Sequence, residues 1–489
     1  MAEDTNRRDE GALATEIPDR NLPGVPYADL PEPIPLKRVI GPSVLLLAAS
    51  IGSGEYVLWP YITTQLGFAL VWLMLLGIGT QYFVNVEIER YTLATGESAV
   101  VGFMRLWKGW APAFIVMAIV PWAWPGWATG AATTVAFAFG LDAAGVTAPI
   151  TVGLLIATGI ILTVSPVVYK TVEKIQFAMV AAILAFLVLS VFTVIDSSAI
   201  AAFGQGLVSV GEIPAGISTI GIAGVLGAVA FAGAGGTVNL TLSNWARDKG
   251  LGMGGRLPKV VSPFTGEEQA SQQTGYFFRR DEANLKRWDD WYRVANREQF
   301  ITFFVAGAIT LLLFMMVTYS AVGVGNSGED FGFIFNVGEA LGRSVGGWMS
   351  ILFWGAGFAA LFSTNLGVID MVGRVTADIL KVGWLRDSEF WTESKVYFAA
   401  VWAELVFGCA ILLSGMDQPL TLFVIASCLN GFVMFIYSAL LIQLNKGVLP
   451  ARIGPNKWRV GFMWWAVAFY GVLSAWAIIV AVTDPAALA

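Results

Sequence analysis

Long apolar stretches separated by short polar segments recur along almost the whole chain. A stretch of about 20 apolar residues is long enough to cross a bilayer as an α-helix, and the pattern predicts eleven such helices. Their approximate ranges are 39–64, 67–93, 111–140, 149–167, 174–195, 219–243, 300–323, 346–375, 394–414, 419–443 and 460–482. The chain is therefore predicted to be an all-α, polytopic membrane protein.

Basic residues gather in every second connection between these stretches. They are Arg105 and Lys108, Lys170 and Lys174, a run from Arg247 to Arg297, then Lys381, Arg386 and Lys395, and finally Lys446, Arg452, Lys457 and Arg459. The connections around 140–149, 196–214 and 323–341 carry none. Because cytoplasmic loops retain Lys and Arg, we expect an integral plasma (inner) membrane protein with its N-terminus in the cytoplasm and its C-terminus outside.

Two segments are expected to lie outside the bilayer. Residues 1–37 are acidic and lack an apolar core, which predicts a disordered cytoplasmic tail rather than a signal peptide or presequence. The cytoplasmic loop 244–299 contains RRDEANLKRWDDWYRVANREQF, in which Leu285, Trp288 and Tyr292 recur at helical spacing. This pattern predicts an amphipathic helix along the membrane surface, with a partner-binding helix as the alternative.

Glycine runs interrupt two of the stretches, at 52–54 in SIGSGEYVLWP and at 233–236 in FAGAGGTVNLTLSNW. The two runs lie five spans apart, and a repeat of five spans must be inverted in the membrane. Two inverted halves with broken first and sixth helices are typical of secondary transporters that hold substrate near the midplane. Glycines that only permit close helix packing are the alternative.

Residues 41–72, GPSVLLLAASIGSGEYVLWPYITTQLGFALVW, resemble the first helix of the Nramp (natural resistance-associated macrophage protein) metal-transporter family. That family reads GP, an apolar stretch, DPGN, and a glycine-aromatic-x-leucine start to the next helix. ATGESAVVGF after the second span and GVLGAVAF at 224–231 strengthen the resemblance, which covers most of the first six spans. It implies a leucine-transporter-like fold and proton-driven import of a metal ion.

This resemblance implies a 5+5 inverted repeat with broken helices 1 and 6, followed by an eleventh helix. The expected units are 38–196, 197–443 and 444–489. Aligned without gaps, DPGN falls on 52–55 and the family's MPH motif of helix 6 falls on 231–233. The chain thus resembles a divergent member that lacks the family's metal-binding aspartate, methionine and histidine.

Loss of the methionine thioether removes the ligand that favours soft transition metals. A harder cation such as magnesium, or an unselective divalent site, is therefore expected. The residues predicted to bind the substrate or ion are Gly52, Ser53, Gly54, Glu55, Phe231, Gly233, Thr237 and Asn239.

Glu55 is the carboxylate nearest the first glycine run. A charged side chain inside the bilayer costs roughly 2.5–3.5 kcal/mol on insertion scales unless it faces a cavity or a partner. We expect Glu55 to be either an oxygen ligand for the metal or a proton-carrying group. Capping of the helix that restarts after the glycines is the alternative. Glu404, mid-way along the ninth span, is a second candidate for proton coupling.

Tryptophans gather unusually near the middle of the third span, in PWAWPGWATG at 121–130. The aromatic residues expected to line a cavity are Trp59, Trp122, Trp124 and Trp127. Such a cavity can hold an organic cation through cation–π contacts. The alternative is that these rings fill gaps beside proline kinks or face lipid.

Composition agrees with a membrane protein and limits its chemistry. The chain has 489 residues, of which 56% are hydrophobic and 13% charged, and it has no histidine. Cys409 and Cys428 both lie in apolar runs, which favours small core residues over a disulfide. No nucleophile, phosphate loop or dinucleotide motif is present, so we expect no enzyme, no cofactor and no nucleic-acid partner.

Three functions remain open from the sequence. The first is an Nramp-like secondary transporter that moves a divalent cation by alternating access, with possible proton symport. The second is a transporter of the same fold for a small organic solute, such as an amine or amino acid. The third is a non-transporting membrane sensor that retains the fold.

Overall fold

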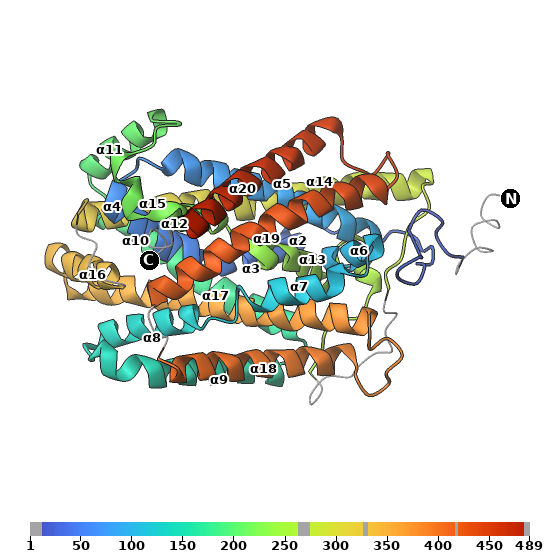
Figure 1. Cartoon of the computed structure of the whole chain (residues 1–489), viewed down its shortest axis with the longest axis horizontal. Coiled ribbons are helices and arrows are strands. Elements are labelled where there is room, and N and C mark those ends of the chain that lie inside the picture. The colour runs from blue at the N-terminus through green and yellow to red at the C-terminus, as the bar shows by residue number, and fades with distance from the viewer. Residues whose placement is uncertain (1–11, 263–273, 326–330, 416–418, 484–489) are drawn as a thin grey trace.

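A computed structural model describes residues 12–262, 274–325, 331–415 and 419–483. Helices dominate these residues, which contain only isolated β-bridges and no strand. Within this described part of the chain, eight helices are long and apolar enough to cross a membrane, and three shorter ones are also apolar. Figure 1 shows the long helices packed side by side along the length of the molecule. The predicted all-α polytopic class is confirmed.

Each of the eleven predicted spans corresponds to a helix or a chain of helices. They are α3 Pro42–Ser50, η2 Ile51–Leu58 and α4 Trp59–Leu66; α5 Val71–Thr95; α7 Trp110–Ile119 and α8 Gly126–Phe139; α9 Ala143–Val164; α10 Val168–Thr193; α12 Gly221–Ala230 and α13 Gly236–Lys249; η5 Gln299–Val305 and α15 Ala306–Val322; α17 Gly347–Val382; α18 Glu393–Leu413; α19 Pro419–Gly447; and α20 Lys457–Thr483.

Shorter helices connect the spans at both ends of the molecule. They are α2 Leu36–Val39, α6 Ala99–Leu106, α11 Ser197–Val208, η3 Ala215–Thr219, η4 Gly252–Arg256, α14 Glu282–Glu298 and α16 Gly332–Ser344. In Figure 1, α11 and α16 lie at one end and the N-terminal segment lies at the other, which we call the N-terminal end. The connections predicted to be basic lie at the N-terminal end.

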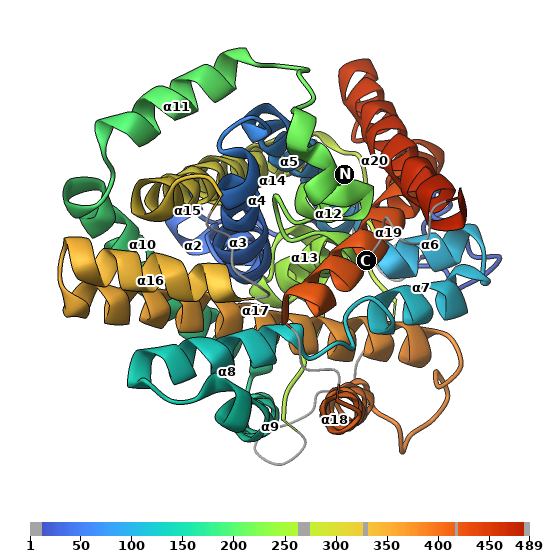
Figure 2. The same cartoon turned by 60° about the vertical axis from the view of Figure 1, so that its left-hand side comes forward.

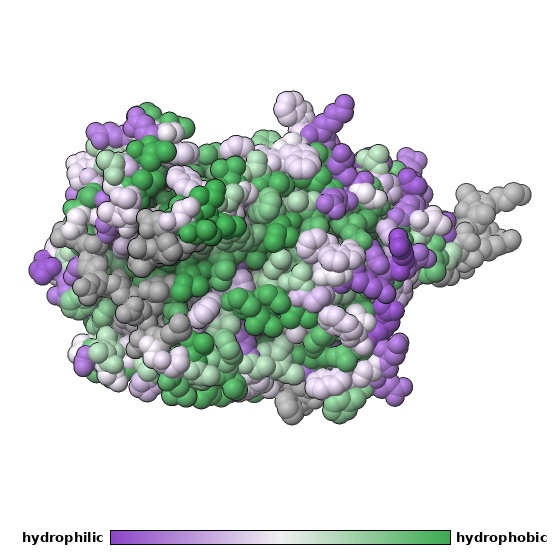
Figure 3. All heavy atoms as spheres, viewed as in Figure 1, coloured by the Kyte–Doolittle hydropathy of each residue, from purple (hydrophilic) through white to green (hydrophobic). Residues whose placement is uncertain are grey.

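The spans interrupted by glycine form the centre of the bundle. Figure 2 shows α3, α4, α12 and α13 surrounded by other helices, and α13 packs against α3, α5, α17 and α19. The outer helices α9, α18 and α20 expose apolar side chains, such as Val406 and Val472. In Figure 3 hydrophobic residues cover the middle of the visible face, and hydrophilic residues are densest at the N-terminal end. This distribution fits a bundle surrounded by lipid.

The N-terminal segment, residues 12–41, corrects the prediction of a disordered tail over 1–37. Val25 and Leu30 are fully buried, and the Leu30 N–H donates to Asn284 Oδ1 at 2.9 Å. Arg105 donates to the Pro18 carbonyl at 2.7 Å. The acidic, proline-containing composition concealed a few apolar residues that pack onto the end of the bundle. The first part of the predicted tail, residues 1–11, lies outside the described residues.

The amphipathic helix predicted in loop 244–299 is present as α14. It continues directly into η5 and α15 as one helical run from Glu282 to Val322. Trp291 is buried and its indole donates to the Pro31 carbonyl at 2.8 Å. The N-terminal segment therefore packs against α14, while the predicted location of this helix along the membrane surface stays a prediction.

Candidate functional site

The first glycine run does not unwind its helix. Residues 51–58 form the π-helix η2, in which the Trp59 N–H donates to the Gly54 carbonyl five residues earlier. Backbone hydrogen bonding thus continues through the predicted break in helix 1, and a π-helix is a common feature of functional sites. The prediction of an unwound segment here is wrong because η2 satisfies the backbone groups that a break would have exposed.

Residues 52–55 contact three different neighbours. The Gly52 N–H donates to Thr364 Oγ1 on α17 at 3.1 Å. A Cβ on Gly54 would collide with the Phe231 carbonyl at the end of α12. Ser53 is buried and its hydroxyl reaches only the Ser50 carbonyl, at 3.4 Å. The run therefore places helix 1 in direct backbone contact with both α17 and helix 6.

Glu55 is fully buried and faces α15 rather than the end of α12. Ser50 Oγ donates to Glu55 Oε1 at 3.0 Å. A Cβ on Gly307 of α15 would lie 3.9 Å from the same oxygen, and Thr310 is the next polar neighbour on that helix. Within the described residues Glu55 Oε2 has no hydrogen-bond partner. One carboxylate oxygen is therefore available to a proton or a ligand.

The second glycine run does break its helix. α12 ends at Ala230 and α13 begins at Gly236, and both Gly235 and Gly236 have positive φ angles, 72° and 50°. Only glycine adopts this conformation readily. The freed backbone is met by Gln81 on α5, whose Nε2 donates to the Ala230 carbonyl at 2.8 Å and whose Oε1 accepts from the Gly235 N–H at 3.2 Å.

The polar residues after this break belong to the same network. Asn239 Nδ2 donates to Gln81 Oε1 at 3.2 Å and to the Tyr437 hydroxyl at 3.1 Å. A Cβ on Gly233 would meet the Gln81 side chain. Thr237 is fully buried, and its hydroxyl has no partner among the described residues. The structure thus brings Gly233 and Asn239 together around Gln81 and leaves the Thr237 hydroxyl available.

Aromatic side chains occupy the space beside the break. Phe231, the first residue after α12, stacks on Trp122 with ring centroids 5.6 Å apart, and Trp122 stacks on Trp127 at 5.2 Å. Trp127 contacts Phe423 of α19 edge-on at 5.1 Å. Trp59 lies elsewhere, and its indole donates to the Ala228 carbonyl at 2.9 Å, which joins α4 to α12. Two of the four predicted cavity tryptophans therefore adjoin the break.

The third span is itself broken at residues 120–125, between α7 and α8. This break opens a pocket of about 280 Å³, which we call the tryptophan pocket. The aromatic and polar side chains that line it are Trp122, Trp124, Trp127, Asn365 and Glu404. In the described part of the chain the three indole N–H groups and Glu404 Oε2 are buried without a hydrogen-bond partner. The pocket therefore offers unpaired hydrogen-bond donors, the indole N–H groups, and an unpaired acceptor, the Glu404 carboxylate oxygen.

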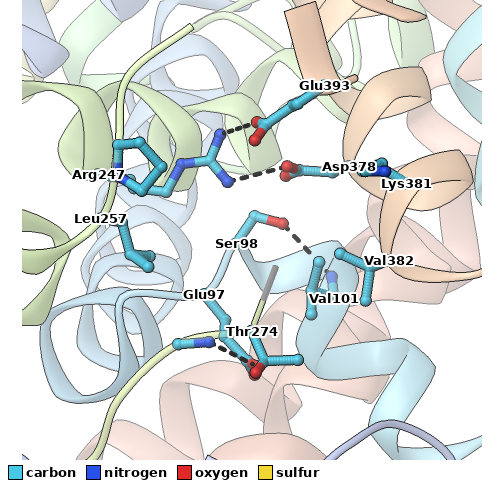
Figure 4. Close-up of a pocket in the computed structure, with 12 residues that line it drawn as sticks. Glu97, Ser98, Val101, Arg247, Leu257, Thr274, Asp378, Lys381, Val382 and Glu393 are labelled. Atoms are coloured by element: carbon cyan, nitrogen blue, oxygen red, sulfur yellow. Dashed lines mark hydrogen bonds and ion pairs between the residues drawn. The ribbon is translucent and has the colours of Figure 1, made fainter. Parts of the chain in front are cut away.

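A second pocket, of about 430 Å³, lies at the N-terminal end between α6, α13 and α17 (Figure 4). Its carboxylates are bound to arginines, and the Lys381 ammonium group donates to backbone carbonyls. Arg247 binds Asp378 at 2.9 Å and Glu393 at 2.8 Å. Burial raises the pKa of Glu97, but the adjacent Arg105 guanidinium outweighs this effect and holds that pKa below its ordinary value. The ion pairs of Arg247 join α13 to α17 and α18. We therefore interpret this pocket as part of the contacts that hold the helices together at the N-terminal end.

Sequence reasoning missed residues that the structure makes central, above all Gln81 and Asn365. Gln81 lies mid-way along an apolar span, and a polar side chain in that position is expensive unless it has a partner. That signal was present in the sequence, but its partner, the broken backbone of helix 6, could not be identified without the tertiary fold. Asp370 and Arg374 form an ion pair at 2.8 Å within α17, and Arg374 also binds Asp248 on α13.

No protein-family model and no curated protein sequence matches the chain. Solved structures match its fold. A manganese transporter of Eremococcus coleocola, in a mutant form, has a TM-score of 0.63 at 14% identity, covering 92% of this chain and 88% of its own. MhsT in complex with L-phenylalanine has a TM-score of 0.53 at 15% identity, covering 89% and 97%.

Mhp1, a nucleobase-cation-symport-1 family transporter with bromovinylhydantoin bound, has a TM-score of 0.52 at 13% identity, covering 96% and 97% of the two chains. The protein thus has the leucine-transporter-like fold, which it shares with transporters of different substrates. At these identities the likeness establishes the architecture, and it does not assign the substrate.

Proposed function

We propose that the protein is a secondary active transporter that carries a small organic solute with a cationic amino group, such as an amine or amino acid, by alternating access. The fold supports transport, because it is shared with a metal transporter and with two proteins bound to organic molecules. The observation that carries the choice of substrate is the tryptophan pocket, which is lined by the α7–α8 connection and by α8, α9, α17 and α18, and whose Trp122 stacks on Phe231.

The chemistry of the tryptophan pocket favours a solute that both donates and accepts hydrogen bonds. Glu404 supplies a carboxylate for an ammonium group, and indole N–H groups can donate to a solute carboxylate. Indole faces also attract cations. An amino acid satisfies both kinds of group at once.

Calorimetry with three related probes tests this proposal. L-Phenylalanine carries both groups, phenethylamine lacks the carboxylate, and phenylacetate lacks the ammonium group. We expect affinity to fall in that order. Replacing the charged acceptor with Glu404→Gln should weaken L-phenylalanine binding about tenfold or more, since a charge-assisted hydrogen bond contributes about 1.5–3 kcal/mol.

Two tryptophan variants make the test specific. Trp124→Phe keeps a ring but deletes one indole N–H of the pocket, and it should weaken L-phenylalanine more than phenethylamine. Trp464→Phe on α20, whose side chain is 58% exposed, is the matched control and should leave both affinities unchanged. The organic-solute proposal would be wrong if wild type bound all three probes with equal affinity and Glu404→Gln bound them equally well.

Transport of a hard divalent cation is the second candidate, and the free Oε2 of buried Glu55 is the observation that favours it. Against it, Glu55 belongs to no group of three or more Cys, Asp or Glu side chains among the described residues. Calorimetry with magnesium, manganese and calcium decides between the candidates. Binding that disappears in Glu55→Gln, with no response to the organic probes, would make the divalent cation the substrate.

Coupling to protons is part of this proposal, with Glu55 or Glu404 as the group that carries the proton. The alternation of basic and non-basic connections supports a plasma membrane location with the N-terminal end in the cytoplasm. On that basis the ion pairs of Figure 4 close the cytoplasmic side. The inverted halves 38–196 and 197–443 and the added helix in 444–489 remain predictions.

A further inference from the structure

Two buried carboxyl groups lie close together where α5 packs against α14 and η5. Glu89 is on α5, and Glu298 is the last residue of α14. Each is 1% exposed, and the two are close enough to repel each other when both are charged. They lie on the side of the bundle nearer the N-terminal end, away from the tryptophan pocket.

The carboxylate of Glu298 has a clear structural role. It accepts hydrogen bonds from the backbone N–H groups of Gly41 at 3.3 Å and Ser43 at 3.2 Å, and from the Ser43 hydroxyl. These groups form the start of α3, where free N–H groups and the helix dipole stabilise a negative charge. Glu298 therefore fixes the end of helix 1 to α14.

Glu89 has no comparable partner. Counting only described residues, both of its carboxylate oxygens lack a hydrogen bond, and it forms no ion pair. Gln299 lies against it and is fully buried, yet neither atom of the Gln299 amide makes a hydrogen bond of normal geometry. Asn85, one turn away on the same face of α5, is fully buried with both amide atoms unpartnered within the same residues.

An arrangement of this kind needs a cation. A buried carboxylate without a partner is very costly, and the cost falls when a proton or a metal ion binds. Lys249 is a protein cation that interacts with Glu298, and it is already paired with Glu173 at 2.6 Å. The groups left over are oxygens of Glu89, Gln299 and Asn85, and an all-oxygen set is what hard cations prefer.

The position of the cluster connects it to the break in helix 6. Gln81, Asn85 and Glu89 follow one another at intervals of four on α5, so they form a stripe along one face of that helix. Gln81 holds the broken backbone at Ala230 and Gly235. At 1.5 Å per residue, Glu89 lies about 12 Å from Gln81 along the helix. A cation bound at Glu89 would therefore contact α5, the same helix whose Gln81 side chain holds the break in helix 6.

We propose that Glu89, Gln299 and Asn85 form a binding site for a hard metal cation, separate from the solute pocket, and that this ion is coupled to transport. Cation binding at this site does not depend on the proposed function, whereas the coupling of the ion to transport rests on that function. Monovalent and divalent hard cations share the required chemistry, and titration distinguishes them.

The test measures the thermal stability of the purified protein in detergent with choline chloride as the only salt. NaCl, KCl, MgCl2 or CaCl2 is then added at constant ionic strength. We expect saturable stabilisation by one of these cations. Glu89→Gln should remove the response and, without added cation, be more stable than wild type, because a neutral amide replaces an unpartnered carboxylate. Asn85→Ala should weaken the apparent affinity about tenfold.

The control is Glu212→Gln, which removes an exposed carboxylate and should respond to cations as wild type does. The proposal is wrong if no salt stabilises wild type, or if Glu89→Gln responds equally. It is also wrong if only acidification stabilises wild type, since the cluster would then hold a proton alone. Failure here with intact L-phenylalanine binding overturns the ion site only, whereas loss of all solute binding with a working ion site overturns the proposed function.

Discussion

Helix 1 and helix 6 each carry a glycine run at corresponding places in the chain, yet only one of them breaks. In helix 1 the glycines have helical angles and lie where another backbone approaches, so that Gly54 contacts the Phe231 carbonyl. In helix 6, Gly235 and Gly236 have positive φ angles and end the helix. Glycine thus serves close approach in one helix and a reversal of backbone direction in the other, and sequence spacing does not distinguish these uses.

A large steric effect is expected at the contact between the two helices. Gly54→Ala would place a Cβ against the backbone carbonyl of Phe231, which cannot rotate away. We expect a loss of about 3 kcal/mol in the free energy of unfolding, at the upper end of overpacking effects. The measurement is denaturant unfolding in detergent. Gly79→Ala, where a Cβ would make an ordinary 3.7 Å contact, is the control and should be nearly neutral.

The next effect concerns Gln81, which supports the break in helix 6 and has no counterpart at η2. Gln81→Leu would leave the Ala230 carbonyl, the Gly235 N–H and the Asn239 amide without this partner. Each unsatisfied buried group costs about 1–3 kcal/mol. We expect a lower Tm together with loss of solute binding. A variant that binds L-phenylalanine normally would show that the break does not need this side chain.

A smaller effect separates backbone strain from crowding in helix 6. Gly236→Ala combines a positive φ with a Cβ that meets the Asn430 side chain, whereas Gly140→Ala has a positive φ and open space. The left-handed conformation costs an L-residue about 1–2 kcal/mol. Gly140→Ala should lose about that amount, and Gly236→Ala should lose more. Equal losses in denaturant unfolding would mean that Asn430 moves aside without cost.

Much of the fold was predictable because apolar length alone identifies spans. All eleven predicted ranges correspond to helices, including the four that are built from two or more segments. The N-terminal segment was predicted wrongly, since a few buried residues such as Val25 and Leu30 outweigh an acidic composition once the bundle offers them a surface. The π-helix at 51–58 was missed because the spacing of glycines in the sequence does not indicate which other helix packs against them.

The candidate site was predictable in parts. The tryptophans of the third span and Glu404 were each identified in the sequence, but their meeting in one pocket depends on the packing of α8, α17 and α18. Asn365 was missed because a single amide in an apolar helix has many possible partners. Glu55 was identified correctly as a buried carboxylate, but its direction toward α15 follows from the π-helical geometry of η2.

Uptake into proteoliposomes tests the central claim most directly. Purified protein would be reconstituted, and uptake of radiolabelled L-phenylalanine and of radioactive manganese would be measured side by side, with protein-free liposomes as the background. We predict saturable L-phenylalanine uptake that is lost in Glu404→Gln and retained in Trp464→Phe, with manganese at background. Manganese uptake that disappears in Glu55→Gln, with L-phenylalanine at background, would contradict the account.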